Sequence, residues 1–167
     1  MSLVIMVAVM IEVELSDDEV ALCHLVGRNR ALIARSAGVV DAKMGGQNGS
    51  DADVLGFMGE YAFAKHFNVF PDCGLCPRSG SADGILQGYR YDIKATTYPN
   101  GRLLCTKKDN PDVDMYVLVI VQEPLVKIIG YAFKADLRKE GNLIDLGRGE
   151  GYGMSQDQLR AFKWFED

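Results

Sequence analysis

Seven consecutive apolar residues, Met115 to Val121 (MYVLVIV), constrain this chain more than any other segment. An unbroken apolar run of this length is typical of a central strand that is covered on both faces of its sheet. We expect further strands at 103–106 and 126–133, before and after this run in sequence. Another apolar run, at 3–11, predicts a buried strand near the N-terminus. Such a chain needs a sheet with covering layers.

A long helix is expected near the start of the chain. Ser16 and Glu19 have the spacing of a capping box, which predicts a helix over 16–37. Arg28 and Arg35 lie near one face of this helix, seven residues apart. Two interpretations of that face stay open. It is a solvated surface, or it is a row of contacts to phosphate groups, which arginine binds well.

A second helix is expected over 53–67, with Asp51 or Asp53 as its cap. It is apolar nearly all round, which is typical of a buried helix. Glu60 is a charged exception and shares a face with Phe63. A buried carboxylate without a partner would be costly. We therefore expect Glu60 to contact either a basic side chain or a metal with its water shell.

The remaining segments complete an α/β sheet flanked by helices. We expect a short helix at 134–140 and a last helix from Ser155 to about Trp164. The intervening GRGEGYG segment, 147–153, lacks the Gly-Lys-Ser/Thr ending of a phosphate-binding loop. It is interpreted as a flexible connection.

Residues 83–96 predict a β-hairpin with an unusual pair of carboxylates. A two-residue turn at Gln87 and Gly88 would place Asp83 opposite Asp92. Side chains of directly opposed residues start only about 4.5–5.5 Å apart, and like charges there destabilise a sheet. Either one aspartate holds a proton, or a divalent cation lies between the two carboxylates.

Strand alternation places Lys94 on the same face as Asp92, about 6.6 Å further along the strand. The Ile93 carbonyl lies between them and could be a further metal ligand. Together with Asp83 and an inward-facing Glu60, these residues form a constellation suited to metal-dependent hydrolysis. The metal would activate a water and neutralise phosphate charge, and Lys94 would orient the water or stabilise the phosphoryl group.

Charge and cysteine content exclude some classes. The net charge of −5 argues against a basic surface that coats nucleic acid without specificity. The apolar run at 3–11 is far shorter than the ~20 residues of a membrane span, so we expect no membrane association and a cytoplasmic protein. Cys73 and Cys76 have CxxC spacing, but a second pair of ligands for zinc is missing. A redox pair or reduced thiols are the other interpretations.

These motifs resemble the PD-(D/E)XK nuclease superfamily, in particular its small phage and prokaryotic members. The matching residues are Asp83 and, after eight residues, Asp92-Ile93-Lys94, preceded by Glu60 in the segment GFMGEYAFAKHF. Ala82 stands where the family often has proline. The resemblance is strongest over 53–164, within one nuclease-like domain expected to span 1–167.

The resemblance implies a restriction-endonuclease-like core with a mixed sheet of four or five strands flanked by helices. It implies cleavage of phosphodiester bonds, usually in DNA, with Mg²⁺ or Mn²⁺ as cofactor. Asp83 and Asp92 would bind the metal, Lys94 would act on water or phosphate, and Glu60 would complete the site. Thr96 would be a secondary contact.

Further cations are candidates for contacts to DNA. Besides the arginines of the first helix, these are Arg102, Lys107 and Lys108, although a solvated loop equally explains the adjacent lysines. The alternative function is a non-catalytic module that binds nucleic acid or protein on the same fold. The sequence leaves the mode of cleavage and homo-oligomerisation open.

Overall fold

The structure is a computed structural model that describes residues 10–38, 49–75 and 81–163. Its centre is a mixed five-stranded sheet in the order β1-β6-β5-β3-β2. β3 and β5 run parallel, and the other neighbouring pairs are antiparallel. The α/β class is therefore confirmed. The strands are β1 (Ile11–Glu14), β2 (Gly84–Leu86), β3 (Tyr89–Thr96), β5 (Met115–Gln122) and β6 (Leu125–Phe133).

β5 is the most deeply buried strand of this sheet. All seven residues of the MYVLVIV run are buried, and only Gln122 is exposed. The prediction of a central strand covered on both faces is confirmed. The predicted N-terminal strand lies mostly outside the described residues. β1 covers Ile11–Glu14 and pairs with the edge of β6, with alternate residues buried.

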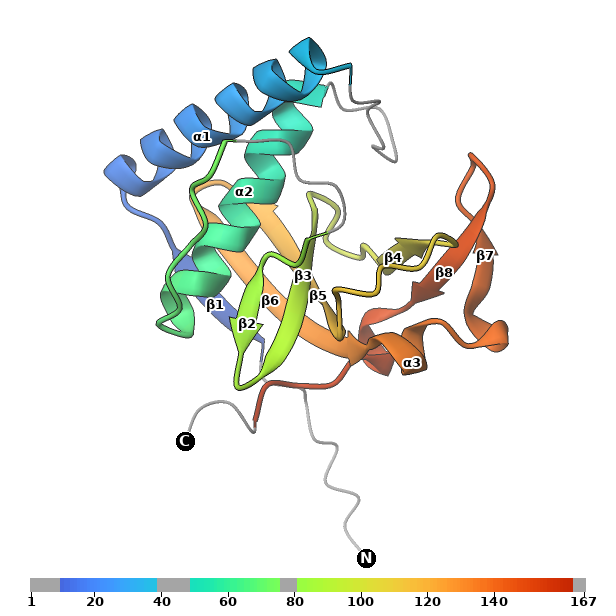
Figure 1. Ribbon diagram of the computed structural model, residues 1–167. Helices are drawn as coiled ribbons and strands as arrows, with labels where there is room; N and C mark the ends of the chain where they lie inside the picture. The colour runs from blue at the N-terminus through green and yellow to red at the C-terminus, as the bar shows by residue number, and fades with distance from the viewer. Residues whose placement is uncertain (1–9, 39–48, 76–80, 164–167) are drawn as a thin grey trace, which may run out of the picture.

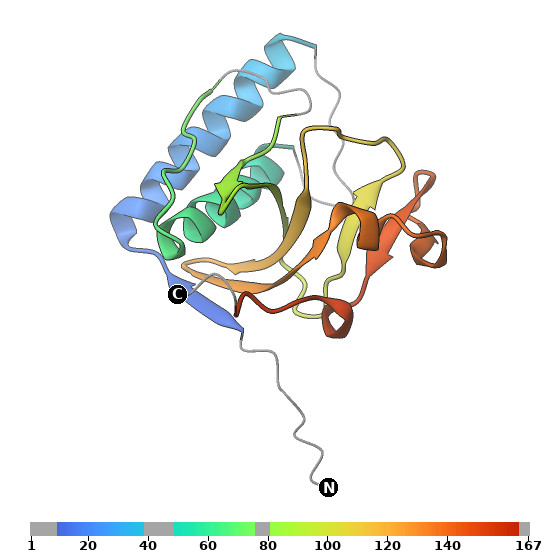
Figure 2. The same cartoon turned by 60° about the horizontal axis from the view of Figure 1, so that its bottom comes forward.

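Two long helices lie on one face of the sheet. α2 (Gly49–His66) lies against the strands and α1 (Asp17–Ser36) packs on α2, as Figures 1 and 2 show. The predicted capping box is present, because the Glu19 backbone N–H donates to the Ser16 hydroxyl and the Ser16 backbone N–H donates to the Glu19 carboxylate. α2 begins four residues before the predicted start, so Asp51 lies in its first turn, where the helix dipole favours an acid.

The opposite face is covered by a second sheet, which the sequence interpretation did not foresee. This sheet is antiparallel in the order β4-β8-β7, with β4 (Leu103–Thr106), β7 (Leu143–Asp145) and β8 (Glu150–Met154). A short helix, α3 (Lys134–Leu137), adjoins it. The expected mixed sheet with flanking helices is present, and its two long helices, α1 and α2, share one face.

The glycine-rich segment and the last predicted helix both differ from expectation. Part of GRGEGYG forms β8, where a Cβ added at Gly151 would lie 2.5 Å from the Cys105 carbonyl oxygen. These glycines allow close strand packing. Ser155 caps only a short 3-10 turn, Gln156–Gln158, because the chain then pairs with β6 through two backbone hydrogen bonds between Tyr131 and Arg160.

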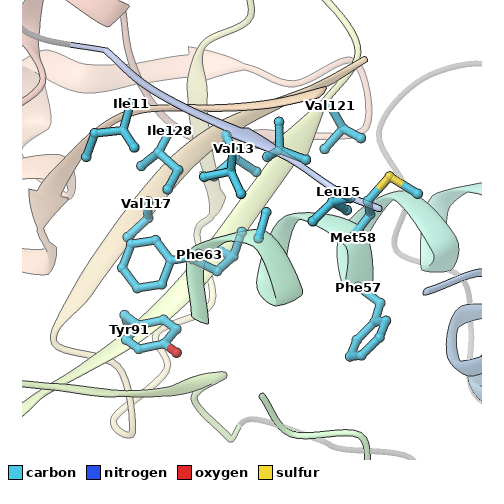
Figure 3. Packing of buried hydrophobic residues seen from close by; sticks show 14 of the residues in the cluster. Ile11, Val13, Leu15, Phe57, Met58, Phe63, Tyr91, Val117, Val121 and Ile128 are labelled. Atoms are coloured by element: carbon cyan, nitrogen blue, oxygen red, sulfur yellow. The ribbon is translucent and has the colours of Figure 1, made fainter. Parts of the chain in front are cut away.

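The larger core lies between α2 and the five-stranded sheet. Figure 3 shows side chains from β1, β3, β5 and β6 meeting those of α2. The rings of Phe63 and Tyr91 are 4.6 Å apart, and both side chains are buried. Tyr91 therefore anchors β3 to the helix that carries Glu60. No described helix is both long and apolar enough to cross a membrane.

α1 and α2 approach most closely at Gly27. A Cβ added there would lie 2.5 Å from the Val54 Cα, which is backbone and cannot move aside. We expect Gly27→Ala to lower the free energy of unfolding by about 1–3 kcal/mol, as overpacking does. Gly56→Ala is the matched control, because nothing lies within 4 Å of its added Cβ. The control should gain up to about 1 kcal/mol from helix propensity. Urea denaturation measures both, and equal effects would contradict the close approach.

Candidate functional site

The β2–β3 hairpin has the predicted turn. Gln87 and Gly88 both have positive φ, 47° and 86°, and Leu86 pairs with Tyr89. The predicted register holds as far as Gly84, which pairs with Tyr91. Gly84 is needed because a Cβ there would collide with the Tyr91 hydroxyl. The hairpin therefore brings Asp83, which directly precedes β2, next to β3, as the sequence predicted.

Asp83 leaves the ladder just beyond that pair. Its backbone N–H donates to the Tyr91 carbonyl at 2.8 Å, and its Oδ2 accepts a hydrogen bond from the Ile93 N–H at 2.7 Å. Asp83 also hydrogen-bonds Asp92 through its side chain. The two carboxyl groups are thus brought together, although Asp83 is offset from the directly opposite position.

Ion pairs and electrostatic interactions link five ionisable side chains: Arg30, Glu60, Asp83, Asp92 and Lys94. Arg30 pairs with Glu60 at 3.0 Å, and Lys94 pairs with Asp92 at 2.7 Å. Asp83 interacts electrostatically with both Glu60 and Asp92. We call this set the charge row. It draws on α1, α2 and the hairpin, so three separate parts of the chain build it.

The sequence interpretation counts Arg30 among the candidate DNA contacts and does not foresee its pairing with Glu60. It is 16% exposed, beside a Glu60 that is 19% exposed, and its guanidinium lies 4.7 Å from the Phe57 ring centroid. It also donates to the carbonyls of Asp72 and Gly74. Of the two partners expected for Glu60, the structure supplies the basic side chain. No local pattern links residues thirty positions apart, so only the packing of α1 on α2 reveals this pair.

Lys94 is held as a cation. Partial burial opposes its charge, but attraction to Asp92 and the hydrogen bond between them outweigh that effect and raise the pKa of Lys94. The ammonium lies 5.7 Å from the centroid of the Tyr116 ring, a further stabilising contact. The Lys94 side chain is 37% exposed, so the row reaches solvent at this end.

The environment of Asp83 favours its protonated form. Burial raises its pKa well above the usual range, and the charges of Glu60 and Asp92 add to the effect. The hydrogen bond from the Ile93 N–H opposes the shift without cancelling it. Of the two resolutions expected for the aspartate pair, the raised pKa favours a shared proton. A proton and a cation would compete for these carboxyl groups.

The oxygen atoms around Asp83 suit a hard divalent cation in part. Within one residue of a strand, the N–H and C=O point to the same side, so the Ile93 carbonyl lies on the Asp83 side of β3. Two carboxylates and a carbonyl are ligands that Mg²⁺ and Mn²⁺ accept. Across residues 10–38, 49–75 and 81–163, however, no three acidic, histidine or cysteine side chains are arranged to hold a metal ion. Glu60 is engaged with Arg30 and would contribute through water.

Arg90 and Asp114 fix the hairpin to the start of β5. The Arg90 guanidinium donates to both Asp114 oxygens, at 2.9 and 2.8 Å, and the Arg90 backbone N–H donates to Oδ2 at 2.8 Å. These hydrogen bonds lower the pKa of Asp114. Asp114 directly precedes the buried run of β5, so the contact joins the start of β3 to the start of β5.

The predicted DNA-binding residues fall in two places. Arg28 and Arg35 are exposed on the outer side of α1, opposite to the side from which Arg30 reaches Glu60. Arg102 and Lys108 are exposed at the two ends of β4, and Lys107 pairs with Glu150 at 2.6 Å. Their contacts to DNA stay predictions.

β4 lies close to the charge row. Cys105, in the middle of this strand, is near enough to Lys94 for each to affect the pKa of the other. Thr96 accepts a hydrogen bond from the Tyr98 N–H and so supports the turn after β3; its secondary role stays a prediction. Cys73 is a free thiol, and Cys76 lies outside the described residues.

Asp83→Asn should stabilise the protein at neutral pH. A raised pKa means that ionisation of Asp83 opposes folding, so the penalty grows as pH rises toward and through the folded pKa and is absent below the usual range of aspartate. We expect a gain of order 1 kcal/mol at pH 7 or above, which is about 2–4 °C in Tm for a domain of this size. The gain should vanish in acid.

Asp92→Asn is the matched comparison. It leaves Lys94 without its counter-ion at 2.7 Å, so we expect it to lower Tm. Thermal unfolding followed by circular dichroism from pH 4 to pH 9, without divalent metal, compares the two variants. A lower Tm for Asp83→Asn at neutral pH would contradict the raised pKa of Asp83.

Comparison of the chain with models of protein families, with curated proteins and with solved structures finds no match. The function of the charge row must therefore be argued from its own chemistry. The row combines two closely spaced carboxyl groups, a cation that reaches solvent and a partly buried arginine.

Proposed function

We propose that this protein is a metal-dependent nuclease that hydrolyses phosphodiester bonds, most readily those of DNA. The observation that carries the proposal is the contact of Asp83 with Asp92, beside the cation Lys94 at the solvent-exposed end of the charge row. Two carboxyl groups held together are costly in an ordinary hairpin. A catalytic role gives a reason for that cost. We further propose that α2 and the mixed sheet form a restriction-endonuclease-like core.

Asp83, Asp92 and the Ile93 carbonyl would hold Mg²⁺ or Mn²⁺, with Glu60 in support through water. The ion, when bound, supplies an activated water and neutralises charge on the phosphate. Asp83 must lose its proton to serve as a ligand. The hydrogen bond from the Ile93 N–H then fixes the orientation of its carboxylate, because Oδ2 is already engaged.

Lys94 acts as a fixed positive charge in this proposal. Its raised pKa keeps it protonated at neutral pH, so it suits the stabilisation of a developing negative charge better than the removal of a proton. Asp92 and the Tyr116 ring hold the ammonium in place. The N–H groups of the Lys94 ammonium that do not bind Asp92 would orient a water or a phosphate oxygen.

A nucleic-acid strand would reach the site beside β4. Arg102 and Lys108 are exposed at the ends of this strand, and the intervening Cys105 lies near Lys94. Arg138 donates to the carbonyls of Thr106 and Lys107 and so fixes the loop that carries the lysines. The exposed cations at the two ends of β4 are suited to contacts with backbone phosphates.

A second candidate function is a binding module without catalysis. It is favoured by the ion pairs that already engage both outer carboxylates, Glu60 with Arg30 and Asp92 with Lys94. A protein whose charges are satisfied internally needs no metal to fold. Only the nuclease would cleave DNA, whereas both candidates would bind it.

Cleavage of labelled linear and circular DNA, single- and double-stranded, tests the nuclease. We expect cutting with Mg²⁺ or Mn²⁺ and none with EDTA. Lys94→Ala should lower the rate by about 10²–10³-fold, as loss of a group that stabilises transition-state charge does, while DNA binding survives. Asp92→Asn should lose at least as much.

Lys127→Ala is the control, because this lysine lies on β6 with its ammonium 4.0 Å from Glu12 and away from the row. Its rate should match the wild type. Absence of cutting on every substrate, with DNA still bound, would favour the module without catalysis. Cutting that Lys94→Ala and Asp92→Asn both retain would place the active site elsewhere.

Metal binding should release a proton from Asp83. Because the cation and the proton compete for the same carboxyl group, the affinity for Mn²⁺ should rise with pH. Titration calorimetry in two buffers of different ionisation enthalpy measures the proton count. Asp83→Asn should release no proton and bind Mn²⁺ more weakly. An affinity independent of pH in the wild type would contradict the role of Asp83 as a ligand.

A further inference from the structure

The outer side of α1 carries a regular stripe of exposed residues. The opposite side of the helix packs inward through buried Cys23, Val26 and Gly27. The exposed positions follow one another at alternate spacings of four and three residues, which is the spacing of a coiled-coil seam. We call them the α1 seam: Asp18, Ala21, Leu25, Arg28, Leu32 and Arg35.

The α1 seam carries Ala21, Leu25 and Leu32 between two charged ends, with Arg28 at its middle. Leu25 and Leu32 are 61% and 55% exposed, high values for leucines on a helix that packs against the rest of the molecule. Asp18 stands at the N-terminal end of the stripe and Arg35 at the C-terminal end. Opposite charges at opposite ends make the stripe complementary to itself when it is reversed.

We propose that the α1 seam binds the same seam of a second copy of this chain, with the two helices antiparallel about a two-fold axis. In that register Leu25 lies against Arg28 of the other copy, whose methylene stem covers it. Further along the seam, Ala21 faces Leu32, a small residue against a large one. At each end Asp18 faces Arg35. Two-fold symmetry makes every contact occur twice.

Other occupants fit the α1 seam less well. A parallel pair of helices would place Asp18 against Asp18 and Arg35 against Arg35, which is repulsive. A nucleic acid would meet Arg28 and Arg35 but also the two exposed leucines and Asp18, which have nothing to offer a phosphate. A second copy satisfies both the charges and the apolar residues.

The proposed dimer leaves the charge row undisturbed. Arg30 points to the inner side of α1, where it contacts Glu60 and the Phe57 ring. The seam residues lie on the opposite side of the helix, so association and the chemistry of the row can be tested separately. The dimer stands whether or not the proposed nuclease activity does.

Charge reversal at the ends of the seam provides the test. Sedimentation equilibrium of the full chain, from micromolar to millimolar concentration, should show a monomer–dimer equilibrium for the wild type. Arg35→Asp alone would oppose Asp18 to an aspartate, and Asp18→Arg alone would oppose Arg35 to an arginine. Each variant should weaken association at least tenfold. An equimolar mixture of the two should dimerise as the wild type does, because both end pairs become attractive again.

Arg148→Asp is the matched control, with the same change of charge on the exposed β7–β8 connection, far from α1 in Figure 1. It should associate like the wild type. Circular dichroism checks that each variant is folded, and Leu32→Glu is a second route to a monomer. A wild type that is monomeric up to millimolar concentration would overturn the proposal. So would a dimer that survives both single reversals, or a mixture that stays monomeric.

Discussion

The burial of β5 on both faces is the constraint on which the other features depend. A strand with no polar residue from Met115 to Val121 needs one layer above it and another below. α2 supplies the first layer and the β4-β8-β7 sheet supplies the second. β3 pairs with β5 between these layers, so its alternate side chains meet different neighbours: Ile93 faces α2, and Lys94 faces Tyr116. The charge row exists because this strand passes between two unlike layers.

Local signals in the sequence predicted much of this structure. The Ser16 capping box, the Gln87-Gly88 turn and the buried run each depend on residues close together in the chain, and each is confirmed. The errors have a different physical origin. The glycine-rich sequence around Gly151 predicts a flexible connection. Its strand structure depends on a close approach to the Cys105 carbonyl, which is a contact between distant segments that local sequence does not reveal. The residues after Ser155 locally predict a helix. Pairing with β6, which is distant in sequence, extends the chain there instead.

The candidate site likewise combines contacts that local sequence predicts with contacts between distant segments. The meeting of Asp83 with Asp92 follows from the turn and from the period of a strand, so sequence alone could anticipate it. The pairing of Arg30 with Glu60 could not be anticipated, because it depends on how closely α1 and α2 approach at Gly27. Arg30 lies about one helical turn beyond that glycine, where it contacts Glu60 and the Phe57 ring of α2. Helix packing therefore determines which partner the buried carboxylate receives.

The charge row is electrically neutral when Asp83 is protonated, the form that its raised pKa favours. Two cations, Arg30 and Lys94, then balance two anions, Glu60 and Asp92. A neutral row attracts a polyanion such as DNA only weakly. Loss of the Asp83 proton together with uptake of a divalent cation would leave one net positive charge in a partly buried place, where its field is poorly screened. Metal binding would thus create the positive charge that attracts phosphate. The metal would bind first and the nucleic acid second.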